Sequence, residues 1–279
     1  MHKMLLQAGA CAAGCVSRRR LEGLMDADAQ ARAEALCPQW KSLLCAAFPY
    51  GGAAGDSRIS LYARGADYHA VLRTRLEQAA EGLQAALPHN RFVFCADVSP
   101  FPEVRAAALA GLGKLGRQGL LITEQAGSLV FLGFLVTDAD LPETGGEMIP
   151  CAGCGACVRA CPGGALGCQN RFDEERCLSA LTQKRGALTE AQTALVKQGG
   201  LLWGGDRCQL ACPENRHITV PPLPEFAPQP DPTEQDLQLS DRQFRKRYAG
   251  RAFVWRGVQP LRRNAEILKE KEENNALEE

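Results

Sequence analysis

The sequence lacks three features that would each point to a class of protein. No apolar run approaches the roughly 20 residues of a membrane-spanning helix, so an integral membrane protein is not expected. The 32 basic and 32 acidic residues leave no formal net charge, which argues against non-specific coating of nucleic acid but allows a local basic patch. Positive charge follows the mildly apolar stretch 1–17, whereas a signal peptide carries it in front. We therefore expect a cytoplasmic protein, as a monomer.

Cysteine, by contrast, is abundant, with thirteen in 279 residues. Disulfide frameworks belong mostly to short secreted domains, and this chain is long and has an odd cysteine total, so we expect free thiols. Free cysteine in an apolar stretch behaves as a small buried hydrophobe. We expect this of the five cysteines in the first 150 residues, namely Cys11, Cys15, Cys37, Cys45 and Cys95. The other eight fall between positions 151 and 212.

The first four of these eight form the run C-x2-C-x2-C-x3-C, followed by Pro162. Bacterial ferredoxins use this run to bind 4Fe-4S clusters. Three thiolates on a tight loop can reach three irons of one cubane, and the fourth cysteine points toward a second cluster. A structural zinc site is disfavoured because zinc ribbons use two well-separated pairs. The predicted ligands are Cys151, Cys154, Cys157 and Cys161.

Two such clusters need eight ligands, and the chain offers further cysteines downstream. Exchange between the two runs gives the first cluster Cys151, Cys154, Cys157 and Cys212, and the second cluster Cys161, Cys177 and Cys208. The ferredoxin pattern would place one more cysteine at position 205, which is glycine. We hypothesise that Cys168 supplies the eighth thiolate. The alternatives are a three-iron cluster, an open iron site or another ligand such as Asp206, each of which would make the second cluster atypical.

The hydrophobic pattern predicts an α+β fold for the first part of the chain. Strands are expected at 42–48, 92–96, 120–123 and 128–136, and helices at 68–87 and 104–115. Glycine and proline at 142–150 and six prolines in 221–232 indicate boundaries. We predict a mixed-sheet domain over 1–145, a small helical ferredoxin-like domain over 146–222, and a proline-rich connector with a basic helical segment over 223–279.

Several sequence blocks resemble the epoxyqueuosine reductase family, from about residue 36 to 263. The blocks are Tyr62 to Arg73, Asp97 to Glu103, Ala110 to Gly113 with Gly116, Gly127 to Gly133, Arg176 to Thr182, Asp206 to Asn215 and Leu239 to Asn264. The resemblance implies a cobalamin-binding N-terminal domain followed by two 4Fe-4S clusters, and reduction of epoxyqueuosine to queuosine in tRNA. It places the catalytic acid on Asp97. The implied cobalamin contacts are Tyr62, Arg64, Asp97, Gly111, Gly113, Gly116, Ser128 and Ser179.

The chain departs from the family at several positions. Gly205 replaces a cluster cysteine, Glu214 replaces a tryptophan, and Ala180 replaces a tyrosine near the substrate. The N-terminal region is also shorter by a helical segment. A divergent paralogue with a different substrate is therefore an open alternative.

The candidate acid has a structural alternative, because an aspartate ahead of a helix is often its N-cap. The apolar neighbours of Asp97 predict a raised pKa, which would let it donate a proton near neutral pH. His69 is expected to be a surface or capping residue rather than a cobalt ligand. The Gly111 to Gly116 segment follows a helical stretch, so it does not predict a dinucleotide site.

Residues 240–263 hold eight Arg or Lys against one acidic residue. This basic segment either contacts tRNA phosphates or packs as a solvated helix face. The reaction implied by the resemblance also needs an external electron donor of the flavodoxin or ferredoxin type. The alternative function is a ferredoxin-like electron-transfer protein that has lost cobalamin or tRNA competence, and a third is a corrinoid-processing partner.

Overall fold

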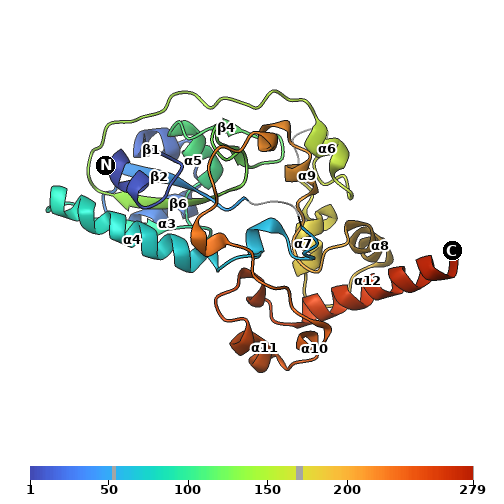
Figure 1. The fold of residues 1–279 in the computed structure, drawn as a ribbon. Helices are drawn as coiled ribbons and strands as arrows, with labels where there is room; N and C mark the ends of the chain where they lie inside the picture. Colours follow the sequence, from blue (N-terminus) through green and yellow to red (C-terminus); the bar gives the residue numbers. More distant parts are fainter. Residues whose placement is uncertain (52–54, 168–171, 279) are drawn as a thin grey trace. The chain divides into compact units, whose positions relative to one another are not determined.

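The computed structural model describes residues 1–51, 55–167 and 172–278 (Figure 1). The chain forms two compact units, each assembled from separate segments. Unit 1 comprises Met1–Gly51, Tyr68–Gly153 and Pro213–Pro224. Unit 2 comprises Gly52–Asp67, Cys154–Cys212 and Glu225–Glu279.

Unit 1 is built on a four-stranded sheet in the order β1-β2-β6-β3. Its strands are β1 (Ala12–Ser17), β2 (Ser42–Pro49), β3 (Phe92–Cys95) and β6 (Val130–Thr137). Cys45 of β2 pairs with Gly14 on one side and Phe134 on the other. The α+β class is confirmed, and the sheet is antiparallel rather than mixed because β6 lies between β2 and β3 and runs opposite to both.

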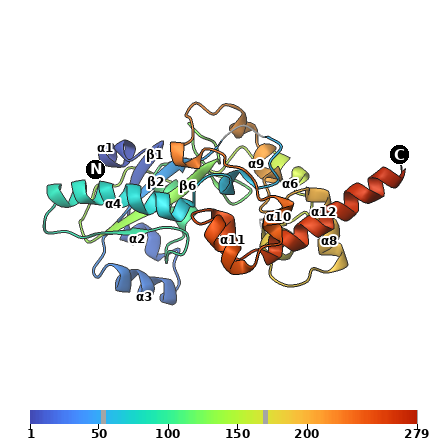
Figure 2. The same ribbon diagram turned by 60° about the horizontal axis from the view of Figure 1, so that its bottom comes forward.

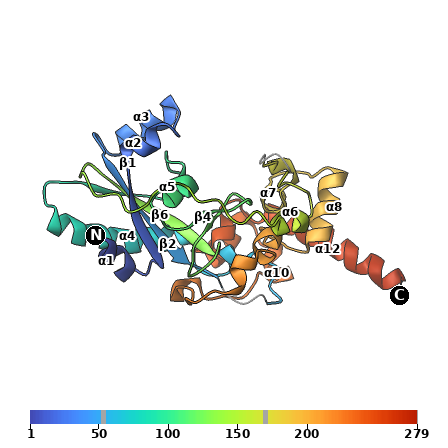
Figure 3. The same cartoon turned by 90° about the horizontal axis from the view of Figure 1, so that it is seen from above.

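Helices cover both faces of this sheet (Figure 3). Helices α1 (His2–Gln7) and α4 (Tyr68–Ala86) pack on one face, and α2 (Arg18–Glu22), α3 (Ala27–Leu36) and α5 (Glu103–Leu109) lie on the other. Helix α4 matches its predicted period, because Leu72, Leu76 and Leu83 recur on one side and are buried. A short ladder joins β4 (Lys114–Leu115) to β5 (Leu121–Ile122).

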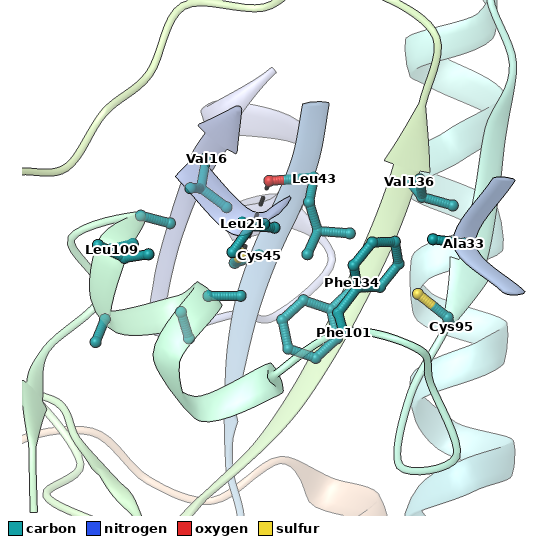
Figure 4. Close-up of a cluster of buried hydrophobic side chains, with 14 of the residues drawn as sticks. Val16, Leu21, Ala33, Leu43, Cys45, Cys95, Phe101, Leu109, Phe134 and Val136 are labelled. Atoms are coloured by element: carbon teal, nitrogen blue, oxygen red, sulfur yellow. Dashed lines mark hydrogen bonds between the residues drawn. The ribbon is translucent and has the colours of Figure 1, made fainter. Parts of the chain in front are cut away.

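The main hydrophobic core lies between the sheet and the α2, α3 and α5 helices (Figure 4). Figure 4 shows Leu43 and Phe134 of the sheet facing Phe101 from the loop before α5. The rings of Phe101 and Trp40 pack in a T-shaped arrangement, with centroids 5.1 Å apart. The N-terminal cysteines were expected to be small buried apolar residues. This is confirmed for Cys15, Cys37, Cys45 and Cys95, which are buried, whereas Cys11 is partly exposed.

Unit 2 consists of short helices, one long C-terminal helix and turns around a small apolar cluster (Figure 2). The cluster joins α7 (Leu178–Gln183), α8 (Glu190–Gly199) and α12 (Gln259–Glu278). The other helices are α6 (Ala156–Ala160), α9 (Arg207–Leu210), α10 (Glu234–Leu237) and α11 (Asp241–Arg247). Single 3₁₀ turns occupy Leu61–Ala63, Glu174–Arg176 and Ala252–Val254 in unit 2, Pro213–Arg216 in unit 1, and Pro224–Phe226 where the two meet in sequence. Within the described residues, no helix has the length and apolar character needed to cross a membrane.

Candidate iron–sulfur and acid–base sites

Three cysteines from separate segments of unit 2 lie close enough to interact electrostatically. Cys161 follows α6, Cys177 precedes α7, and Cys208 lies within α9. Burial raises the pKa of the Cys208 thiol to about 12, and the charges of Cys177 and Cys161 contribute to the rise. Thiols in such a group ionise at neutral pH only if a cation balances their charge. The structure thus brings together the three cysteines that the exchanged pattern assigns to the second cluster.

A glycine after Cys161 allows this approach. A Cβ atom at Gly163 would lie 2.0 Å from the main-chain oxygen of Arg176, so only glycine fits where the two segments pass. The main-chain N–H of Ala165 donates to the Cys161 sulfur at 3.2 Å. Amide hydrogen bonds of this kind help to stabilise thiolate ligands of iron–sulfur clusters.

The glycine at position 205 lies beside the same group. A Cβ atom there would lie 3.1 Å from the main-chain nitrogen of Ser179, two residues after Cys177. The neighbouring Asp206 is buried, with one carboxylate oxygen accepting from the Ser60 hydroxyl and the other from the Leu61 N–H at 2.9 Å. Because both oxygens are engaged, the structure argues against Asp206 as an iron ligand. Cys168 lies outside the described residues.

The remaining cluster cysteines flank two helices that pack together, α6 and α9. Cys157 lies in α6, Cys212 follows α9, and both are buried, whereas Cys154 is exposed. Gly153 and Gly155 adopt left-handed φ values of +68° and +72°, which wrap the loop before α6. Cys151 belongs to unit 1, where its N–H donates to the Leu115 carbonyl at 3.0 Å. No three His, Cys, Asp or Glu side chains in the described residues meet around a single ion, and a cubane does not require this because each iron takes its own cysteine.

In unit 1, Asp97 lies in the loop between β3 and α5 and pairs with a histidine. Its carboxylate Oδ2 is 3.1 Å from His69 Nε2, and both side chains are about half exposed. Asp97 does not cap α5, because the N-cap is Pro102 and no side chain caps the helix. It also lacks the expected apolar enclosure, since Val98 is 88% exposed.

A carboxyl with a raised pKa is found at Glu103, the first residue of α5. Burial raises the pKa of Glu103 to about 7, a hydrogen bond from Ser99 opposes the rise, and the Asp97 charge adds to it. Sequence reasoning missed Glu103 because a glutamate in a first helical turn is common and favourable. It also missed the pairing of His69, because residues 28 apart in sequence meet only through the tertiary fold.

Several of the candidate cobalamin contacts are engaged within their own unit. The Tyr62 hydroxyl accepts from Trp203 Nε1 at 2.7 Å, and the buried Arg64 donates to the Ile59 carbonyl at 2.8 Å. The main-chain N–H of Ser128 donates to Asn215 Oδ1 at 2.7 Å.

The glycine-rich element forms turns, although the sequence predicted that the helix continues through it to residue 115. Gly111 has φ of +83° and ends α5 six residues before the predicted end, so the helix is Glu103–Leu109. A Cβ atom at Gly113 would lie 2.2 Å from the Ile122 oxygen, and one at Gly116 would lie 2.8 Å from the Leu120 oxygen. These glycines therefore permit close packing of the β4–β5 ladder.

Each unit contains a pocket beside candidate residues. In unit 1, a pocket of about 680 Å³ is lined by Gly111, Gly113, Lys114, Thr123 and Gln125 among others. The ammonium group of Lys114 lies 3.0 Å from the Glu214 carboxylate at this pocket. In unit 2, Ser179 and Ala180 line a pocket of about 490 Å³ with Cys177 and the half-exposed Trp255.

Much of the basic segment is engaged inside unit 2. Arg251 donates to the Arg64 carbonyl, Arg262 to the carbonyls of Leu237 and Leu239, and Arg263 to those of Leu181, Lys184 and Gly186. Helix α11 is different, because its cationic side chains are exposed. Of these, Arg245 pairs with Asp241 and Arg247 pairs with Asp236. Arg242 and Lys246 share one face of this helix, four residues apart.

Comparisons with known proteins place these features in a family. The family described as 4Fe-4S double cluster binding domain matches residues 150–215, and the one described as Epoxyqueuosine reductase QueG, DUF1730, matches residues 31–98. The fold and the cysteine pattern thus define an iron–sulfur protein of the double-cluster type. An epoxyqueuosine reductase from Gloeobacter violaceus is 35% identical over 242 residues, covering 82% of this chain and 76% of the relative. The chain belongs to the epoxyqueuosine reductase family.

Other relatives extend further than this chain. The epoxyqueuosine reductase of Lactococcus garvieae is 38% identical over 204 residues, which span 72% of this chain but 58% of the relative. A crystal structure of a selenomethionine-labelled epoxyqueuosine reductase matches with a TM-score of 0.83 and 26% identity, covering 95% of this chain and 80% of that one. An epoxyqueuosine reductase bound to a tRNA stem loop matches with a TM-score of 0.82, 26% identity and coverage of 95% and 79%.

Proposed function

We propose that this chain is a reductase that converts epoxyqueuosine to queuosine in tRNA, with two 4Fe-4S clusters and cobalamin as cofactors. The observation that carries the proposal is the grouping of Cys161, Cys177 and Cys208, since the second cluster of this family requires it. The relatives named above support the substrate. The reaction adds two electrons and two protons to the epoxide, breaks its C–O bonds, forms a carbon–carbon double bond and releases the oxygen as water.

Seven cysteines would hold the clusters, and the eighth ligand is proposed to be Cys168. The first cluster takes Cys151, Cys154, Cys157 and Cys212, and the second takes Cys161, Cys177, Cys208 and Cys168. In a Cys168→Ser variant we expect the second cluster to lose one iron, which iron and sulfide analysis with electron paramagnetic resonance would detect. Unchanged cluster content would exclude Cys168.

Cobalamin would supply a strongly reducing cobalt centre when bound. The unit 1 pocket fits part of such a ligand, because the amide groups of a corrin need neutral hydrogen-bonding partners and Gly111, Thr123 and Gln125 line this pocket. The proposed contacts in unit 1 are Asp97, Gly111, Gly113, Gly116 and Ser128, and those in unit 2 are Tyr62, Arg64 and Ser179. Corrin absorption bands in anaerobically reconstituted protein would support binding.

Asp97 would donate a proton to the departing epoxide oxygen. Its half-exposed carboxyl can receive protons from solvent, and His69 at 3.1 Å can hold a proton between turnovers. Bacillus subtilis epoxyqueuosine reductase has been solved with its catalytic aspartate loop swung out of the active site, and the Asp97 loop is the corresponding candidate here.

The decisive experiment measures turnover of epoxyqueuosine in tRNA by nucleoside analysis, with a chemical reductant. Asp97→Asn should lower turnover by about 10²–10⁴-fold while cobalamin and cluster contents stay unchanged. Asp140→Asn, at an exposed aspartate of the same unit, is the matched control. Full turnover by Asp97→Asn would remove the acid role, and no turnover by the loaded wild-type protein would refute the proposed activity.

The electron donor is proposed to be a flavodoxin or ferredoxin, and the protein is proposed to act as a cytoplasmic monomer. All twelve cysteines among the described residues are free of disulfides, as a reducing compartment favours. The alternative function is an electron-transfer protein without cobalamin or tRNA competence. Its support is the internal engagement of Arg251, Arg262 and Arg263, which removes them from contact with nucleic acid. Cluster absorption without corrin bands after reconstitution would favour this alternative.

A further inference from the structure

The unit 2 pocket gathers two exposed aromatic side chains. Phe172 is 60% exposed and Trp255 is 52% exposed, and both line the pocket of about 490 Å³ beside Cys177. Its volume lies within the range of roughly 300–1,000 Å³ that is usual for ligand sites. Single exposed apolar residues are common on protein surfaces, but two large rings at one pocket indicate a surface that binds a partner.

The main chain around Trp255 is held by α11. Arg245 of this helix donates from Nη2 to the Trp255 carbonyl at 3.1 Å. Three residues further on, the Val258 N–H donates to Asp241 Oδ1 at 2.8 Å. The ring of Trp255 is therefore presented from a fixed main chain, which lowers the entropy cost of binding a flat partner.

Arg256 adds positive charge to this aromatic surface. Its guanidinium carbon lies 3.7 Å from the centre of the Trp255 ring, a cation–π contact. Its Nε atom is inaccessible to solvent and has no hydrogen-bond partner among the described residues. A buried N–H group without an acceptor is costly. An anionic oxygen that enters the pocket would supply this acceptor after a small rotation of the side chain.

The charges that line the pocket leave a positive excess. Lys184, Arg185 and Arg256 line it together with two carboxylates, Glu174 and Glu175. One of these carboxylates is already paired, because Lys184 Nζ lies 2.7 Å from Glu175 Oε2. The pocket therefore favours a ligand that is both flat and anionic.

We propose that this pocket binds one unpaired nucleotide of an RNA substrate, with its base stacked on Trp255 and its phosphate paired with Arg256. This inference rests on the proposed action on tRNA. Bases of single-stranded RNA are bound by stacking on aromatic side chains and on arginine, and their phosphates by cations. An acidic peptide would use the cations of the pocket but not its rings.

The first test maps the contact directly. The full, cluster-loaded chain is mixed with an RNA hairpin that carries iodouridine in its unpaired loop and no epoxyqueuosine, and is then irradiated anaerobically. Mass spectrometry should place the photo-cross-link on Trp255 or Phe172, because a halogenated base reacts with the ring on which it stacks. A fully paired RNA of the same length is the control and should give no such product. A photo-cross-link confined to residues outside the pocket would overturn the proposal.

The second test measures the contribution of the ring to affinity. Trp255→Ala should weaken binding of the hairpin by about 10- to 100-fold, as expected for the loss of one stacked base, and Trp255→Phe should retain most of the binding. Leu210→Ala, at a side chain of unit 2 that is 51% exposed and does not line the pocket, is the matched control. Fluorescence anisotropy of labelled RNA is the measurement. Equal affinities of the wild type and Trp255→Ala would refute the stacking.

The third test concerns the phosphate. Arg256→Gln should reduce the salt dependence of hairpin binding by about one charge. Lys269→Gln, which removes an exposed cation of the same unit that does not line the pocket, should leave the salt dependence unchanged. An unchanged slope for Arg256→Gln would remove Arg256 from the site. Displacement of the hairpin by an acidic peptide would overturn the proposal in favour of a protein partner.

These binding measurements do not depend on turnover. If the loaded protein does not convert epoxyqueuosine but the hairpin is photo-cross-linked to Trp255, the proposed activity fails and the RNA site remains. If turnover proceeds and no photo-cross-link forms in the pocket, this inference fails and the proposed activity remains.

Discussion

The two units are stabilised in different ways. Unit 1 buries a broad apolar core between its sheet and helices, including Leu43, Phe101 and Phe134. Unit 2 has a small apolar cluster of Leu178, Leu181, Val196 and Ile267. Its helices α6 and α9 have five and four residues, and isolated helices shorter than about 12 residues are marginal in water. Unit 2 therefore depends on polar cross-links and, by our proposal, on iron.

The polar cross-links of unit 2 satisfy main-chain carbonyls at the ends of short elements. Asn264 is fully buried, and its side-chain amide donates to the carbonyls of Thr182 and Leu202, both at 2.8 Å. The guanidinium of Arg263 donates hydrogen bonds to three further carbonyls. Such bonds specify one geometry but leave less hydrophobic stabilisation than the core of unit 1 provides.

Removal of iron should therefore have the largest effect, and it should be concentrated in unit 2, which supplies all the proposed cluster ligands except Cys151. Metal binding can contribute on the order of 10 kcal/mol to the folding of a small metal-dependent domain. After anaerobic chelation, hydrogen exchange measured by mass spectrometry should show lost protection in α6, α7 and α9 and retained protection in β2 and β6. Equal loss in both units would contradict the comparison, and restored protection after cluster reconstitution is the control.

The converse test breaks the core of unit 1. Phe101→Ala should lower the free energy of unfolding of unit 1 by about 3–5 kcal/mol, because a buried ring at the Trp40 contact is lost. Val98→Ala lies in the same loop at an exposed position and is the matched control. Thermal unfolding checks the prediction, which fails if both variants melt at the same temperature.

The pH dependence of unit 1 should carry the contribution of Glu103. The pKa of Glu103 is about 7 in the folded protein, above its ordinary value of 4.5. The contribution of Glu103 to the free energy of unfolding is therefore fully present below pH 4.5 and is lost as the pH rises through 7. The difference amounts to a loss on the order of 3 kcal/mol. Denaturant unfolding of wild type and Glu103→Gln at pH 5 and pH 8 should show the extra loss only in the wild type. If the two proteins lose the same free energy of unfolding between pH 5 and pH 8, the contribution of Glu103 is excluded.

A smaller effect is expected from one cross-link of unit 2. Arg263→Ala should lower the free energy of unfolding of unit 2 by about 2 kcal/mol, because the carbonyls of Leu181, Lys184 and Gly186 lose a charged hydrogen-bond donor. Arg185→Ala removes an exposed cation nearby and is the control. Hydrogen exchange of the amides in α7 and α12 is the measurement. If both substitutions reduce the protection of these amides by the same small amount, the cross-link is not important for stability.

The smallest effect concerns tRNA. Arg242→Ala with Lys246→Ala should weaken binding of substrate tRNA by about 1 kcal/mol and reduce its salt dependence by about two charges, because both cations are exposed on α11. Stability should not change, in contrast to Arg263→Ala. Binding measured at several salt concentrations tests this, and an unchanged slope would remove α11 from the tRNA interface.

Sequence reasoning succeeded where local spacing decides the outcome. The period of Leu72, Leu76 and Leu83 predicted α4, and the C-x2-C-x2-C-x3-C run predicted a cluster domain that a family match confirms. It failed where partners are distant in sequence. Helix α5 ends early because Gly111 turns to φ of +83°. The sequence also did not single out Glu103, whose pKa is raised by burial, because burial depends on what packs around a residue.

By itself, the sequence determined the chemistry that the chain can carry, because ligand types and their spacing within one loop are local properties. The thirteen cysteines were already divided into apolar and cluster-forming groups by their neighbours. Only the tertiary structure decided which distant groups meet: Cys161 with Cys177 and Cys208, Asp97 with His69, and Arg263 with the carbonyls of α7 and the turn after it. These contacts depend on how segments far apart in the chain pack together, and a local sequence pattern does not contain that information.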